Sequence, residues 1–145
     1  MRLQFWKGQL IDGHAPDMVD ASILAWTDLR GTATPNSPKW IEATDFLSSS
    51  LRRAGQYKAS LEWVSLLLKV ERSPWRLLAA AECNVVLGRD KAAESLMVEC
   101  QKQVKELSAS ERKSEIETAK FLTLQIEKLR SKITGDAHIQ KTTEP

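Results

Sequence analysis

Cysteine and histidine are scarce in this chain of 145 residues, which contains two of each. Cys83 and Cys100 show no CxxC or Cys/His spacing, so we interpret them as buried, reduced thiols in a reducing compartment. His14 and His138 have neither a Ser/His/Asp arrangement nor a metal-ligand spacing around them. The chain also lacks a phosphate-binding loop, a dinucleotide fingerprint and an HExxH motif. These absences predict a protein without a catalytic site, a metal site or a cofactor.

Long apolar runs and an excess of one charge are missing as well. No apolar stretch approaches the ~20 residues that a membrane-spanning helix needs, and the N-terminus has no signal-peptide core. The 21 basic and 19 acidic residues are interspersed, unlike the basic surface that binds nucleic acid. We therefore expect a cytoplasmic protein with neither a membrane nor a nucleic acid as its partner. A short basic cluster at Arg52, Arg53 and Lys58, followed by Glu62, leaves a nucleic-acid-binding bundle as the alternative, and an enzyme with a non-motif active site is the least favoured class.

Apolar residues at helical spacing are what the chain does have, and they make up 42% of it. Ser37-Pro38 and Ser73-Pro74 are helix-start signals, because serine accepts from free backbone N–H groups and proline has no N–H to leave unpaired. Ser108 and Glu111 have the spacing of a capping box, which predicts a third start. The pattern predicts an all-α protein with helices over residues 17–29, 38–54, 56–70, 75–87, 91–107 and 108–133.

The same pattern predicts how the chain is divided. We expect an N-terminal packed arm over residues 1–15, one helical domain over residues 16–133 and a disordered tail over residues 134–145. The last helix carries a narrow apolar seam, which we expect to pack on the preceding helices rather than on a partner helix. The residues of this seam are Ile116, Ala119, Leu122, Ile126, Leu129 and Ile133.

An internal repeat is the most informative feature. A shift of 33 residues places Gly55 on Gly88 and also superimposes short side chains on short ones. The matched pairs include Lys58 with Lys91, Ala59 with Ala92, Ser60 with Ala93, and Val64 with Met97. We expect the small residues Ala59, Ser60, Ala92 and Ala93 to lie where neighbouring helices pack closely. Each repeat has the same order of elements: a helix, a glycine turn and a second helix that begins with small residues, followed by a new Ser-Pro start. This order is typical of a helical-hairpin solenoid.

On these residues the chain resembles the tetratricopeptide repeat family over two units, 38–72 and 73–105, with the helix 108–133 in the place of the capping helix. The resemblance implies antiparallel hairpins stacked as a short solenoid. The chain departs from the family signature at three pairs of positions. Its glycine is replaced by Ser48 and Ala81, its tyrosine by Leu51 and Asn84, and its closing proline by Arg72 and Lys105. An unrelated antiparallel helix bundle is the alternative.

The function that the resemblance implies is a non-catalytic scaffold, an adaptor or co-chaperone, that holds a peptide or helix of another protein in a concave groove. An obligate subunit of a permanent complex would have a similar sequence. Some groove candidates have a competing interpretation. For Arg52 and Arg53 it is a solvated helix end, which the helix dipole favours. For Trp75 it is a position in the core. The groove candidates are Glu42, Asp45, Ser49, Arg52 and Arg53 on one helix, Trp75, Leu78, Glu82 and Val85 on the next, and Arg112, Ile116 and Lys120 from the last.

Overall fold

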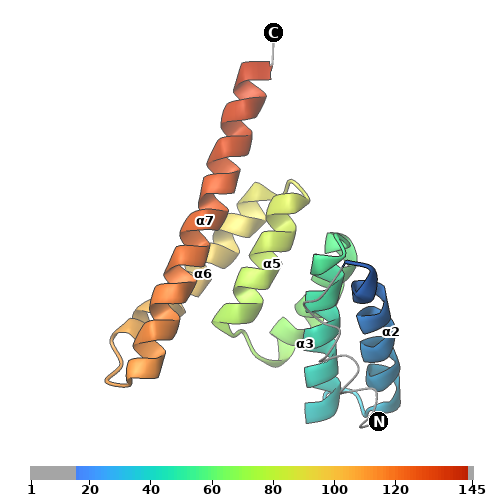
Figure 1. Ribbon diagram of the computed structural model, residues 1–145. Coiled ribbons are helices and arrows are strands. Elements are labelled where there is room, and N and C mark those ends of the chain that lie inside the picture. Colours follow the sequence, from blue (N-terminus) through green and yellow to red (C-terminus); the bar gives the residue numbers. More distant parts are fainter. Residues whose placement is uncertain (1–15, 144–145) are drawn as a thin grey trace. The chain divides into compact units, whose positions relative to one another are not determined.

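The regular structure of the described residues is entirely helical (Figure 1). The computed structural model describes the backbone of residues 16–143 and the side chains of residues 21–133. The all-α prediction is therefore confirmed, whereas the predicted arm over residues 1–15 lies outside the described residues. The helices are α2 (Pro16–Thr32), α3 (Pro38–Arg53), α4 (Tyr57–Val70), α5 (Pro74–Val86), α6 (Asp90–Ser108) and α7 (Lys113–Thr143).

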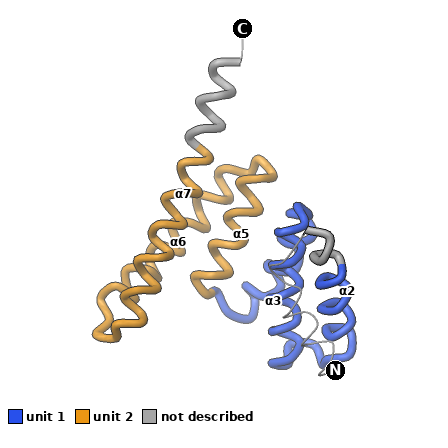
Figure 2. Tube along the Cα trace, in the orientation of Figure 1, with its two compact units in different colours: residues 1–72 blue, residues 73–145 orange. Residues whose placement is uncertain are grey.

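The chain divides into two compact units, Met1–Arg72 and Ser73–Pro145 (Figure 2). Unit 1 contains α2, α3 and α4, and unit 2 contains α5, α6 and α7. The sequence pattern predicted one helical domain over residues 16–133 and placed a repeat boundary between residues 72 and 73. The division between the units falls at that repeat boundary.

Unit 1 is built on α3, which packs against both α2 and α4. Its core joins Trp26 and Leu29 of α2 to apolar residues of α3, and Trp26 is fully buried. The ring of Phe46 stacks on the indole of Trp26 with 4.6 Å between centroids and 11° between planes. A buried aromatic removes a large apolar area from water, so this stack is the main apolar contact between α2 and α3.

Small hydroxyl side chains allow the helices of unit 1 to approach closely. Ser48 on α3 and Ser60 on α4 are both buried, and their hydroxyl oxygens lie 3.0 Å apart. The Ser60 hydroxyl donates to the Ser48 carbonyl oxygen at 2.7 Å, and the Ser48 hydroxyl lies 3.1 Å from the Ser60 carbonyl oxygen. On the other side of α3, the buried hydroxyls of Ser22 and Ser50 lie 3.1 Å apart. Each of these polar groups is therefore paired within the helix contact, as burial requires.

A cation packed against aromatic rings completes unit 1. The guanidinium carbon of Arg30 lies 3.8 Å from the centre of the Trp63 ring and 5.0 Å from that of Trp40. Arg30 belongs to α2, Trp40 to α3 and Trp63 to α4, so one side chain connects the three helices. Partial burial lowers the pKa of the Arg30 guanidinium from its ordinary value by desolvation. The rings provide the cation–π attraction that partly offsets this desolvation.

Unit 2 is a three-helix bundle in which α7 packs on both α5 and α6. The middle of the predicted seam is confirmed, because Ala119, Leu122, Ile126 and Leu129 are buried. Leu77 of α5 and Met97 of α6 are fully buried in the same unit.

One charged contact fixes α7 beside α6. The Arg130 guanidinium donates to the Glu94 carboxylate at 2.7 Å and to the Gln101 side-chain oxygen at 3.0 Å. Arg130 lies on α7, whereas Glu94 and Gln101 both lie on α6. The contact is partly exposed, so its contribution to stability is modest, and its fixed geometry sets the register of the two helices.

The hairpins α3–α4 and α5–α6 have the same turn. Gly55 and Gly88 have φ values of +79° and +75°, the left-handed conformation that glycine adopts without strain. The residue after each glycine donates its backbone N–H to a carbonyl five residues earlier, Gln56 to Leu51 and Arg89 to Asn84, both at 2.8 Å. This is the 6→1 bond of a Schellman turn.

The two Ser-Pro starts are also confirmed. The side chains of Ser37 and Ser73 accept from backbone N–H groups three residues later, those of Trp40 and Arg76, at 3.3 Å in both cases. The repeat predicted from the sequence therefore has a structural counterpart at both ends of the first helix in each hairpin.

Three details differ from the sequence predictions. Ser108 is the last residue of α6, and its hydroxyl donates back to the Lys105 carbonyl oxygen at 2.9 Å, so it does not cap α7. Helix α7 begins at Lys113 and runs to Thr143, which includes residues that the pattern assigned to a disordered tail. Ala92 is exposed, so Ala93 alone of that pair is a close-packing residue.

Candidate protein-binding surfaces

The predicted groove residues of unit 1 follow one face of α3. Glu42 and Arg53 are exposed, and the other three are half-buried. The first four are spaced three or four residues apart and Arg53 directly follows Arg52, so all five lie on one side of the helix, away from the buried positions that face α2 and α4. This stripe consists of Glu42, Asp45, Ser49, Arg52 and Arg53.

The basic end of that stripe is held by α3 itself. Arg52 Nη1 donates to the buried Ser48 hydroxyl at 3.4 Å, which ties the guanidinium to the Ser48/Ser60 contact. Arg52 and Arg53 lie in the last helical turn, where the helix dipole favours positive charge. Part of the role of Arg52 is therefore structural, and Arg53 is the more accessible of the two.

The predicted groove residues of unit 2 divide into surface and core. Trp75, in the first turn of α5, is 50% exposed, and Leu78 and Glu82 on the same helix are half-buried. Val85 is only 7% exposed and belongs to the core, whereas the next residue, Val86, is 51% exposed. The α5 face, defined as Trp75, Leu78 and Glu82, is the accessible part of the prediction.

Helix α7 meets the α5 face through a residue that the sequence analysis missed. The Phe121 ring lies 5.6 Å from the Trp75 ring between centroids, at a tilt of 38°. Phe121 is itself 50% exposed, so the aromatic pair is open to solvent on one side. The sequence does contain an indication of this contact, because Phe121 is an aromatic residue that lies outside the apolar seam of the last helix. The groove prediction for the last helix named Arg112, Ile116 and Lys120 instead.

No described contact joins Trp75 to the three predicted residues near the start of α7, which are Arg112, Ile116 and Lys120. Lys120 Nζ lies 3.7 Å from the Glu117 carboxylate, and Arg112 Nη1 lies 3.6 Å from the Glu115 carboxylate. Both are local ion pairs three residues apart, and Lys120 and Arg112 are exposed. Ile116 is half-buried at the beginning of the seam.

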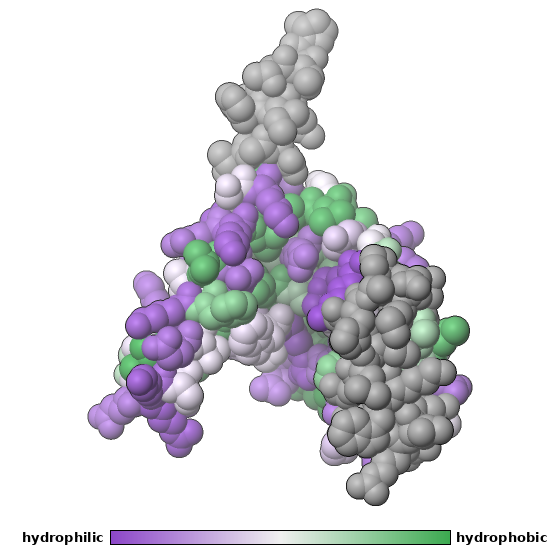
Figure 3. All heavy atoms as spheres, viewed as in Figure 1, coloured by the Kyte–Doolittle hydropathy of each residue, from purple (hydrophilic) through white to green (hydrophobic). Residues whose placement is uncertain are grey.

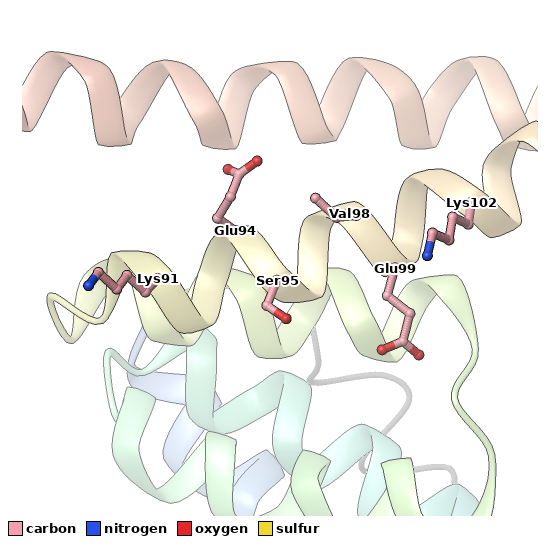
Figure 4. Close-up of a pocket in the computed structure, with 6 residues that line it drawn as sticks. All are labelled: Lys91, Glu94, Ser95, Val98, Glu99 and Lys102. Atoms are coloured by element: carbon pink, nitrogen blue, oxygen red, sulfur yellow. The ribbon is translucent and has the colours of Figure 1, made fainter.

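The hollows in the described surface of unit 2 are shallow. One lies along α6 alone, with Glu94 and Val98 directed toward α7 (Figure 4). A second lies between α6 and α7, and its lining includes Val98, Lys102 and Glu127. Because the first is formed by a single helix, it does not enclose a small molecule.

The described residues also contain no group of three or more His, Cys, Asp and Glu side chains that could hold a metal ion. The Cys100 thiol is buried and lies 3.4 Å from the Pro74 carbonyl oxygen. Burial, with a smaller contribution from the charge of Glu99, raises the pKa of this thiol to about 11. Cys100 is therefore protonated at neutral pH and is not a nucleophile.

Comparison with known proteins gave no match, whether to a family model, to a curated protein or to a solved structure. Among the described helices, none has both the length and the apolar character needed to cross a membrane. The surfaces of the two units are therefore the basis for any functional argument.

Proposed function

We propose that this protein is a non-catalytic adaptor or co-chaperone that binds a peptide or helix of another protein. The observation that supports this most directly is the exposed indole of Trp75, which has Phe121 against it and solvent on its other side. Tryptophan is enriched among the residues that contribute most to protein interfaces. Half of this side chain has no described use within the fold, and a partner that covered it would gain apolar burial.

The repeated hairpin supports the scaffold part of the proposal. The glycine turns and the serine caps are alike in α3–α4 and α5–α6, as expected of successive units in a tetratricopeptide-like array. In unit 2, α7 contacts both helices of the preceding hairpin, which is the arrangement that a capping helix requires. We propose that the partner binds to the α5 face of unit 2.

The two thiols support a proposal for the compartment. Cys83 and Cys100 are buried, and neither forms a disulfide. A reducing compartment maintains this state, which supports a cytoplasmic location for the proposed adaptor.

Affinity capture with variants tests this function. The wild-type chain and Trp75→Ala would each be used as bait, with Leu24→Ala as the matched control, since Leu24 is an exposed apolar residue in unit 1 at 72% exposure. We expect one protein to be retained by the wild type and by Leu24→Ala, and its affinity for Trp75→Ala to fall about tenfold or more, the loss typical of an interface hot spot. Circular dichroism would show that each bait is folded.

Two results would contradict the proposal. One is equal retention of the same protein by the wild type and Trp75→Ala. The other is recovery of nucleic acid at physiological salt, which would favour the basic cluster at Arg52, Arg53 and Lys58 as the binding site. Charge reversal at Arg53, as Arg53→Glu, tests the α3 stripe of unit 1 on its own, and we expect a smaller effect on capture than that of Trp75→Ala because an exposed charge contributes little to affinity.

A further inference from the structure

The side of α7 that faces away from the core carries two large apolar side chains. Phe121 is 50% exposed and Leu124 is 47% exposed. At about 100° of rotation per residue, Glu117, Phe121, Leu124 and Lys128 lie within a sector of about 60° whose centre is about 150° from the buried seam. We refer to these four residues as the outer stripe. The outer surface of a helix in a small bundle is ordinarily polar, so the two apolar residues call for a partner surface.

The outer stripe is symmetric in spacing and complementary in charge. From Glu117 the steps are four residues to Phe121, three to Leu124 and four to Lys128. An identical helix placed antiparallel, with a two-fold axis between Leu122 and Thr123, brings Phe121 opposite Leu124 of the second copy. The same operation brings Glu117 opposite Lys128 of the second copy, and the reverse pair forms at the other end. A parallel arrangement would instead place identical charges opposite each other.

We propose that the outer stripe is a self-association surface on which α7 of a second copy of this chain docks antiparallel. A two-fold dimer needs a self-complementary patch, and the outer stripe meets that requirement in both spacing and charge. The two apolar pairs lie at the centre and the two ion pairs flank them, which is the usual layout of an interface core and its rim. The Trp75 ring lies beside Phe121 and extends the apolar surface at its edge.

The local charges limit the strength of this dimer. Glu117 has Lys120 of its own helix at 3.7 Å, but both side chains are at least 60% exposed, so that pair is weak and the carboxylate can also accept from Lys128 of the second copy. Lys113 and Lys132 also come opposite each other, farther from the axis than the Glu117–Lys128 pairs. A contact of about three helical turns is smaller than a standard protein interface, so the dimer depends on concentration.

Sedimentation equilibrium with reciprocal charge reversal tests the proposal. We expect the mass of the wild-type chain to rise with concentration toward twice that of the monomer. Glu117→Lys and Lys128→Glu each place like charges at both ends of the contact, and each should weaken the dimer about tenfold. The double variant, Glu117→Lys with Lys128→Glu, restores opposite charges at both ends and should restore the dimer. An equimolar mixture of the two single variants should also associate.

Controls separate this effect from misfolding and from simple net charge. Glu106→Lys makes the same charge change at an exposed position of α6 and should leave self-association unchanged. Leu124→Ala removes an exposed side chain from the centre of the stripe and should weaken the dimer with no loss of helicity. The proposal would be overturned by a wild-type chain that is monomeric at every concentration, or by a double variant that associates no better than the single ones.

The inference is separate from the proposed adaptor function. Glu117, Leu124 and Lys128 are not part of the α5 face, and the readout is the mass of the protein rather than capture of another protein. If the charge reversals reduced capture of a different protein while the wild type stayed monomeric, a foreign partner would occupy the stripe and a second copy would be excluded. If Trp75→Ala left capture unchanged while the reversals altered the mass as expected, the adaptor function alone would be contradicted.

Discussion

The two units share their turns but differ where their helices approach most closely. The 33-residue shift places Ser48 on Ala81 and Ser60 on Ala93, and these four residues are all buried. In unit 1 the two serines exchange hydrogen bonds between α3 and α4. In unit 2 the two alanines bring no polar side-chain atom into the contact between α5 and α6. The shared requirement at these positions is therefore small size, and the chemistry is free to vary.

The third helix differs as well. In unit 1, α2 packs on α3, and the connection to α4 is made by Arg30 against the Trp63 ring. In unit 2, α7 packs on both members of the hairpin through an apolar seam. Both units therefore have an apolar core, and unit 1 adds a cation–π contact between α2 and α4. Both units leave large apolar side chains exposed, among them Leu24 in unit 1 and Val86 in unit 2. In Figure 3, hydrophobic residues interrupt the mostly hydrophilic surface of the described residues.

Removal of the central aromatic of unit 1 should have the largest effect on stability. Trp26 is fully buried and stacks on Phe46, so Trp26→Ala removes a large apolar contact and leaves a cavity. We expect a loss of about 3–5 kcal/mol in the free energy of unfolding, measured by denaturant titration with circular dichroism. Leu24→Ala, at an exposed position of the same helix, is the control and should change stability by less than about 0.5 kcal/mol. If Trp26→Ala lowered the free energy of unfolding by less than about 0.5 kcal/mol, the stack would not be what holds α2 on α3.

Adjacent alanines in unit 2 allow a sharper test of close packing. Ala93 is fully buried, so Ala93→Leu forces a larger side chain between α5 and α6 and should lower stability by about 1–3 kcal/mol. Ala92 is exposed on the same turn, and Ala92→Leu should be nearly neutral. Thermal unfolding of the two variants in parallel gives the comparison. Equal losses would contradict the assignment of Ala93, rather than Ala92, to the helix contact.

The helices and turns could be predicted from sequence because their causes are local. A serine before a proline starts a helix, and a glycine in the left-handed conformation ends one, through hydrogen bonds to residues close by in the sequence. The helix starts at Ser37 and Ser73 and the turns at Gly55 and Gly88 were therefore predicted correctly. The capping box at Ser108 failed for a local reason as well. The spacing was right, but α6 continues to Ser108, whose hydroxyl returns to the Lys105 carbonyl and is not available to α7.

The candidate surfaces were harder to predict, because they depend on which side of each helix is covered. Residues 85 and 86 are both valine, and only the packing of the α5 helix decides that Val85 is buried and Val86 is exposed. Phe121 was missed because an exposed aromatic has no periodic signal. The contact between Trp75 and Phe121 joins residues far apart in sequence, and the packing of α7 on α5 creates it.

The smallest expected effect comes from conversion of the serine contact of unit 1 into the alanine contact of unit 2. Ser48→Ala and Ser60→Ala should each lower stability by about 1 kcal/mol, because each removes one partner of a buried hydrogen-bonded pair. The double variant removes both hydroxyls and reproduces the chemistry of Ala81 and Ala93. Its loss should therefore be smaller than the sum of the single losses, by roughly 0.5 kcal/mol or more. Denaturant titration of the four proteins measures this coupling. Strict additivity would mean that the two hydroxyls act independently and that the contacts in the two units differ by more than the serine-to-alanine exchange.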